Sequence, residues 1–141
     1  APLYLGGLTS VFTTMPYHDT HFTLEEARSL LPELSHKFHR VQELVASLRQ
    51  RELEMQRIQQ LIRSNGQGSK HPDFGVVISE IQEIVASITE QGIEIKDLER
   101  GLIDFPHWRN GQEVYLCWLF GEDDIHFWHS IEEGFAGRTP L

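Results

Sequence analysis

Hydrophobic residues recur with a helical period through the first half of the chain, between residues 23 and 63. They fall at alternating spacings of three and four, which places them along one face of a helix. These positions are Leu24, Ala27, Leu31, Leu34, Phe38, Val41, Val45 and Leu48. A stripe of this length must be buried, so the sequence predicts a long helix around which the rest of the chain is organised.

The start of this helix is marked by Thr23 and Glu26, which have the spacing of a capping box. Pro32 lies inside the pattern, where it removes one helical hydrogen bond and its ring clashes with the preceding turn. We therefore expect a short helix at 24–30, a break or kink, and a long helix that begins at Pro32 and ends near Arg63.

A second helix is predicted from Asp73 to Gln91, and Gly92 is placed to end it in a left-handed cap. Its apolar stripe consists of Phe74, Val77, Ile81, Ile84 and Ile88. We expect the two helices to form an antiparallel hairpin in which the shorter helix covers residues 44–62 of the longer one. Residues 24–38 must then be covered by the remainder of the chain.

From Ile93 onward the hydrophobic period changes to the alternation that is typical of β-strands. Asn110-Gly111 is a strong hairpin signal, and a two-residue turn there sets Arg109 opposite Gln112. The last third of the chain is therefore predicted to form a small antiparallel sheet.

The next connection, at residues 121–124, is interpreted as a four-residue loop, which sets Leu116 opposite His129. One face of the sheet then carries Ile103, Phe105, Val114, Leu116, Trp118, Ile125, Phe127 and His129. The opposite face carries Asp104, Trp108, Tyr115, Cys117, His126 and Trp128. We expect the first face to cover the long helix, and a register that differs by one residue would exchange the two faces.

These patterns predict an α+β fold, in which a long, coiled-coil-like antiparallel helical hairpin packs on a small C-terminal antiparallel β-sheet. Residues 1–22 mix apolar and turn residues and are expected to form an irregular arm, and residues 23–141 to form a single domain. The arm would be pinned against the body or a neighbouring chain by Leu3, Tyr4, Phe12 or Tyr17.

The tail at residues 134–141 contains two glycines and a proline, which argue against regular structure. It also contains apolar residues, so we expect it to dock on the sheet with Phe135 inserted. Arg138 would pair with Asp104 or Glu122.

Charge and composition narrow the classes of partner. Twelve basic and twenty-one acidic residues give a formal net charge of -9, which repels phosphate backbones and argues against nucleic acid as a partner. No apolar run approaches the ~20 residues needed for a transmembrane segment. Cys117 is the single cysteine, so no internal disulfide calls for an oxidising compartment, and we expect a cytoplasmic protein.

Several linked motifs resemble the prokaryotic domain-of-unknown-function 2203 family over about residues 22–141. In order, they are TLEEARSLLPEL, GIEIKDLERGLIDFP, EVYLCW, GEDDIHFWH and GFAGRTPL. The positions that carry the resemblance are Lys96, Asp97, Asp104, Pro106, Cys117, Trp118, Glu122, Trp128, His129, Phe135 and Arg138. The resemblance implies a family and no particular activity.

Three pairs of histidines three residues apart are candidate metal ligands: His18 with His21, His36 with His39, and His126 with His129. Imidazoles at this spacing share a helix face but point to opposite faces of a strand. Only His36 and His39 are predicted to be helical. The alternative is that these are surface histidines or histidines with structural hydrogen bonds.

A second candidate site lies in the C-terminal third. Its members are Asp104, Trp118, Glu122, Trp128, His129 and Arg138. An imidazole beside carboxylates could hold a metal or act as a base, and the tryptophans could wall an apolar pocket. The alternative is a core histidine, a turn carboxylate and a structural ion pair. Cys117 is interpreted as an inert packed thiol because no activating cation is evident near it in sequence.

The pattern as a whole favours a non-catalytic protein-interaction or scaffold module that self-associates through its helices. Apolar residues beside the main stripes would need such a partner, and they are Leu44, Leu53, Leu61, Ile78 and Val85. The alternative is a small-molecule- or metal-binding protein that uses Asp104, Glu122 and His129. An enzyme ranks third, and the sequence indicates no catalytic residue and no particular cofactor.

Overall fold

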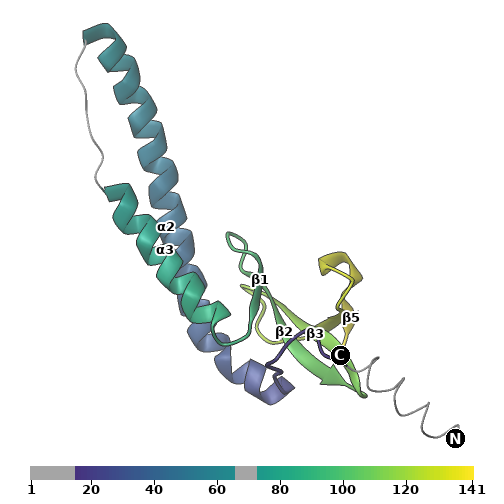
Figure 1. The fold of residues 1–141 in the computed structure, drawn as a ribbon. Coiled ribbons are helices and arrows are strands. Elements are labelled where there is room, and N and C mark those ends of the chain that lie inside the picture. The colour runs from purple at the N-terminus through teal and green to yellow at the C-terminus, as the bar shows by residue number, and fades with distance from the viewer. Residues whose placement is uncertain (1–14, 66–72) are drawn as a thin grey trace, which may run out of the picture.

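The computed structural model describes residues 15–65 and 73–141 and shows an α+β fold (Figure 1). Two helices, α2 (Leu24–Asn65) and α3 (Asp73–Thr89), are followed by the strands of one sheet. The strands are β1 (Glu94–Asp97), β2 (Leu102–Arg109), β3 (Gln112–Leu119), β4 (Phe127–Ser130) and β5 (Thr139–Pro140), with the 3-10 helix η1 (Phe135–Gly137) before the last. Within the two described stretches, no helix is long and apolar enough to cross a membrane.

The capping box at the start of α2 is confirmed. The amide of Glu26 donates to the Thr23 hydroxyl (3.0 Å), and the amide of Thr23 donates to the Glu26 carboxylate (3.3 Å). Two amides that no helical carbonyl can reach are thereby satisfied, which fixes where the helix begins.

Of the break or kink predicted at Pro32, the break is absent, because α2 runs through this residue without interruption. Pro32 is exposed, while Ala27, Leu31, Leu34 and Phe38 around it are buried. A proline inside a helix costs about 3 kcal/mol, whereas burying one large apolar side chain contributes about 1.5 to 3 kcal/mol. Burial of several such side chains therefore outweighs the cost of one proline.

The register of the helical hairpin is set by Arg40 of α2, whose guanidinium is paired with the carboxylate of Glu80 of α3. Asp73, where α3 begins, lies seven residues before Glu80 and is therefore opposite residue 47 of α2. The prediction that α3 covers residues 44–62 is wrong, because α3 lies further toward the sheet. Figure 1 shows α2 continuing well beyond the start of α3.

The second helix ends at Thr89, two residues before the predicted end. Gly92 follows with a positive φ of 95°, and its amide donates to the Thr89 carbonyl (3.0 Å). A side chain at this position would meet Thr20, since an added Cβ would lie 2.8 Å from the Thr20 Cβ. Glycine is therefore required both by the backbone conformation and by the close approach.

The sheet is an antiparallel meander in the order β1-β2-β3-β4-β5. The predicted turn is confirmed: Asn110 and Gly111 have φ values of 52° and 77°, and Arg109 pairs with Gln112. The register of β2 against β3 follows directly from this turn.

The predicted register of β3 against β4 is wrong by one residue. Tyr115, and not Leu116, lies opposite His129, because the connection between the strands spans residues 120–126 and is longer than the predicted four-residue loop. The one-residue difference moves His129 and Phe127 to the face that carries Asp104 and moves Trp128 to the helix-facing side.

The core lies between the sheet and the part of α2 nearest to it. Its buried members are Phe22, Ala27, Leu31, Leu34, Phe38, Ile88, Ile93, Ile103, Phe105, Leu116, Trp118 and Ile125. The expectation that the sheet covers residues 24–38 of the long helix is thus confirmed.

The opposite face of the sheet is lined by the segment at 15–22 and by the tail. The Phe22 amide donates to the Pro106 carbonyl (2.7 Å), and the Leu141 amide donates to the His126 carbonyl (2.9 Å). Tyr17 does not pin the arm by burial, since its side chain is 75% exposed. Leu3, Tyr4 and Phe12, the other predicted pins, lie outside the described residues.

Two expectations for the tail are corrected. Phe135 is 40% exposed and is not inserted into the core. Regular structure is present, because β5 pairs with β4 through Thr139 and Pro140, and η1 precedes it. Both elements are short, so they tolerate the glycines and place the proline on an edge strand.

The position of Pro32 generates the first prediction. Pro32→Ala restores a helical hydrogen bond at an exposed position, so we expect the free energy of unfolding to rise by about 1 to 3 kcal/mol. Denaturant unfolding measures this change. Glu33→Ala is the control at the next exposed position; it removes only a surface ion pair with Lys37 (2.9 Å) and should change stability by less than about 1 kcal/mol. A lower stability for Pro32→Ala would mean that the proline conformation is required by the packing on the sheet.

Candidate functional site

A buried polar cluster lies on the sheet face that points away from α2. Asp104 of β2 is directly opposite Cys117 of β3, and His129 is on the neighbouring strand β4. Each of the three residues is only 1% exposed. Buried polar groups require partners, so their hydrogen bonds define what this cluster can do.

The imidazole of His129 is held from both sides. Its Nδ1 donates to the backbone carbonyl of Ser130 (2.8 Å), and its Nε2 lies 2.9 Å from Oδ1 of Asp104. A carbonyl can only accept, so Nδ1 carries a hydrogen. Without a proton on Nε2, the lone pair of this nitrogen would face the lone pairs of the carboxylate oxygen. A proton between the two atoms turns this contact into a hydrogen bond.

A proton at this point makes a buried ion pair. Burial alone would lower the pKa of His129, but the hydrogen bond to Asp104, contact with Cys117 and the Ser130 carbonyl raise it to about 10. The histidine is therefore charged at neutral pH and is paired with the Asp104 carboxylate.

Cys117 completes the cluster. Its sulfur, a ring nitrogen of His129 and a carboxylate oxygen of Asp104 all lie within 4.8 Å of one another. The composition is that of a cysteine–histidine–aspartate triad, but the arrangement differs. In such a triad the two ring nitrogens face the nucleophile and the acid separately; here Nδ1 is bonded to Ser130 and Nε2 faces Asp104. The geometry does not support nucleophilic catalysis.

A second polar pair lies beside this cluster and joins the tail to the sheet. The guanidinium of Arg138 donates to both carboxylate oxygens of Glu122 (2.6 and 3.0 Å) and to the Cys117 carbonyl (3.3 Å). It also stacks between the rings of Phe127 (4.2 Å) and Phe135 (4.7 Å). Of the two partners predicted for Arg138, the structure therefore selects Glu122.

The bidentate pair also fixes the charge of Glu122. Burial alone would raise the pKa of this carboxyl, but hydrogen bonds from Arg138 and from the Leu119 amide (2.7 Å) hold it below its ordinary value. Glu122 is thus an anchor for the tail and the turn, and its carboxylate oxygens are already engaged.

A cavity of about 270 Å³ lies next to the buried cluster. It is lined by the three cluster residues and by Lys96, Glu132 and Phe135. The cavity therefore provides space for a small ligand directly beside the cluster.

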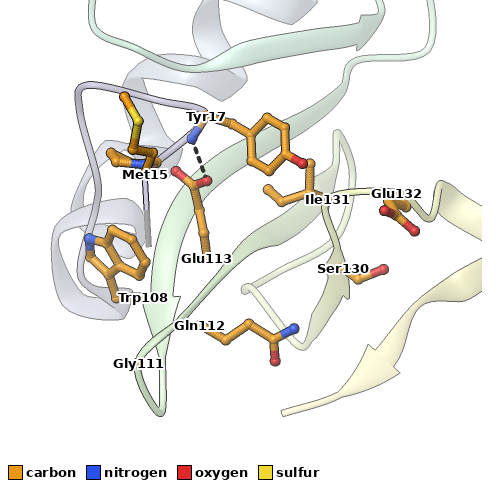
Figure 2. A pocket seen from close by; sticks show the side chains of 10 residues that line it. Met15, Tyr17, Trp108, Gly111, Gln112, Glu113, Ser130, Ile131 and Glu132 are labelled. Carbon is orange, nitrogen blue, oxygen red and sulfur yellow. Dashed lines mark hydrogen bonds between the residues drawn. The ribbon is translucent and has the colours of Figure 1, made fainter. Parts of the chain in front are cut away.

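A larger cavity, of about 350 Å³, lies near the turn between β2 and β3 and does not include the cluster. Figure 2 shows Glu113 within it, accepting a hydrogen bond from the Tyr17 amide (2.7 Å). The same carboxylate accepts from the His18 amide (3.1 Å) and bonds His21 (2.6 Å). Glu113 therefore serves to fasten the segment at 15–22 to the sheet.

Comparison of sequences assigns the chain to a family. Residues 20–141 match the family described as "Uncharacterized conserved protein (DUF2203)". The chain belongs to this DUF2203 family. Searches of curated proteins and of solved structures found no match.

In this DUF2203 chain, the predicted ligand-binding residues separate into three groups. Asp104 and His129 form the buried pair, and Glu122 and Arg138 form the adjacent pair. The tryptophans lie on the other side of the sheet: Trp118 is fully buried in the core, and Trp128 packs against it.

The other histidines that were predicted as metal ligands do not join a group of three or more ligand residues within the described part of the chain. His36 and His39 are both exposed on α2. His18 bonds the Tyr115 hydroxyl (2.6 Å) and His21 bonds Glu113, so each member of that pair has its own partner. His126 is exposed and paired with Asp123 (2.9 Å).

The residue that sequence reasoning missed is Cys117, which the sequence analysis interprets as an inert packed thiol. The signal was present, because the turn at Asn110-Gly111 sets Asp104 opposite Cys117. Only the error in the β3–β4 register kept His129 away from them.

The Asp104–His129 pair predicts a dependence of stability on pH. Because the folded pKa of His129, about 10, is above the ordinary 6.5, the folded protein holds this proton more tightly than the unfolded chain. The resulting stabilisation is complete below about pH 6.5 and is lost as the pH rises through about 10. His129→Gln should therefore be less stable than wild type by about 3 kcal/mol near pH 6, with a smaller difference near pH 10.

Chemical unfolding of metal-depleted protein across this pH range measures the difference. His126→Gln is the control, because His126 is exposed and also paired with an aspartate; its stability should follow wild type throughout. A constant difference between His129→Gln and wild type would show that the buried histidine is neutral.

Proposed function

We propose that the protein is a non-catalytic interaction module that self-associates through its helical hairpin. The observation that carries this proposal is the distal segment of α2, defined here as residues 50–65, which continues beyond the start of α3. Leu53 and Leu61 of this segment are 68% and 56% exposed.

The energetics of a projecting helix favour a partner. An isolated helix of about 15 residues is marginal in water because nucleation is costly and packing supplies most helical stability. Leu53 and Leu61 are eight residues apart and lie near one face. Burial of each side chain against a partner would contribute about 1.5 to 3 kcal/mol.

Complementarity indicates that the partner is a second copy of this chain. The distal segment contains three arginines against two glutamates, whereas α3 contains three acidic residues, of which Glu80 is already paired with Arg40 of the same chain, and neither lysine nor arginine. Exposed apolar residues are also present on α3, where Val76 and Ile78 are 70% and 45% exposed. The distal segment of one copy thus matches α3 of the other in both charge and apolar character.

This pairing is reciprocal. A two-fold axis would place each distal segment on the partner's α3, so that the same contact forms twice. The result is a bundle of four helices with the two sheets at its ends, in the manner of other antiparallel helical assemblies.

Sedimentation tests the proposal. Wild type should be a dimer at tens of micromolar, and Leu53→Glu should be a monomer with unchanged helical circular dichroism, since Leu53 is exposed within one chain. His36→Glu, which adds the same charge at an exposed position of α2 nearer the sheet, should remain dimeric. A wild-type monomer at this concentration contradicts the proposal.

A second variant tests the assigned contact. Val76→Glu on α3 should dissociate the dimer as Leu53→Glu does. If only Leu53→Glu dissociates it, the two distal segments pair with one another and α3 is not the docking surface.

A further inference from the structure

The Asp104–Cys117–His129 cluster brings three different metal-ligand groups to one point. A carboxylate oxygen, a thiol sulfur and an imidazole nitrogen lie within 4.8 Å of one another in residues that are each 1% exposed. They come from three adjacent strands, β2, β3 and β4, so the sheet itself fixes their relative positions. Binding groups held on rigid strands are positioned more accurately than groups on loops.

The orientation of His129 suits metal binding. Its Nδ1 donates to the Ser130 carbonyl (2.8 Å), which leaves Nε2 facing Asp104 (2.9 Å). Metal-binding histidines almost always donate their other ring nitrogen in this way, because the bond fixes the tautomer and the direction of the lone pair.

The spacing is close to that of a tetrahedral site. Nε2 and Oδ1 of Asp104 are 2.9 Å apart. Two ligands bound to zinc at about 2.0 to 2.1 Å would be roughly 3.3 Å apart. The pair needs to separate by only a few tenths of an ångström.

A divalent ion would also leave the cluster with no net charge. Two anionic ligands, the Asp104 carboxylate and the Cys117 thiolate, neutralise a charge of two. The neighbouring Arg138 and Glu122 neutralise one another through their bidentate pair. No net charge is then buried, which avoids the main cost of placing an ion inside a protein.

We propose that Asp104, Cys117 and His129 bind a zinc ion, whose fourth ligand is a water in the adjacent cavity. Mixed thiolate, imidazole and carboxylate ligands are those that zinc prefers. Zinc replaces the proton between His129 and Asp104 and the thiol proton of Cys117, and both protons are released to solvent. The site rests on the sheet alone and is independent of association through the hairpin.

Titration of metal-depleted, reduced protein with zinc chloride tests the proposal. We expect a rise in melting temperature that saturates at one equivalent, because an ion that binds only the folded state stabilises it. Cobalt chloride should give a thiolate-to-cobalt charge-transfer band, which reports Cys117 directly as a ligand. Wild-type protein that shows neither a saturable shift nor this band overturns the proposal.

Variants assign the site. Cys117→Ser should abolish the cobalt band and weaken zinc binding by at least roughly tenfold, a loss of the size that disturbed metal sites show. His129→Gln should weaken zinc binding similarly, and His126→Gln, the exposed control, should bind as wild type does. If His126→Gln loses binding or Cys117→Ser retains it, the ion is held elsewhere and the proposal is wrong. The wild-type titration tests the proposal without any variant, so it still gives an answer if a variant fails to fold.

Discussion

Burial of one face of α2 against the sheet is the interaction on which the rest of the structure depends. The buried residues from Ala27 to Phe38 meet the strand residues of β2 and β3, including the fully buried Trp118. This contact keeps the helix continuous through Pro32 and fixes which side of the sheet faces the helices. The second helix adds Ile88 to the same core and ends at a glycine that lets residue 20 approach closely.

Once one face of the sheet is committed to α2, the other face must be covered by whatever chain remains. The tail and the segment at 15–22 serve this purpose with polar contacts: Arg138 with Glu122, and Glu113 with three groups of the N-terminal segment. Beneath them, Asp104 and His129 are almost fully buried and pair with one another. The polar cluster is therefore a consequence of a sheet that is buried on both faces.

The sequence predicted those features that local chemistry determines. Thr23 and Glu26 marked the start of α2, and Asn110-Gly111 fixed the β2–β3 register, because a cap and a tight turn each depend on a few adjacent residues. The prediction failed at Pro32, where burial of distant side chains outweighs a local cost. It failed again at residues 120–126, where the connection is longer than the predicted loop and its Ile125 is buried in the core.

Most residues of the candidate site were predicted from the sequence, but the way in which they are grouped was not. Asp104, His129, Glu122 and Arg138 were identified from their chemistry, but their grouping into two pairs depends on the β3–β4 register, which no short motif specifies. The reach of α3 along α2 was also misjudged, since an apolar stripe gives the face of a helix but not the position of its partner along the axis.

The proposed self-association divides α2 into two parts: residues 27–44 contribute to the core, and the distal segment would contact a second molecule. Native-state hydrogen exchange, measured residue by residue at several protein concentrations, tests this division directly. Residues 27–44 should exchange only through global unfolding, together with β2 and β3. The distal segment should exchange much faster in dilute protein and become protected as the concentration rises. Equal protection along the whole of α2 at every concentration would contradict the account.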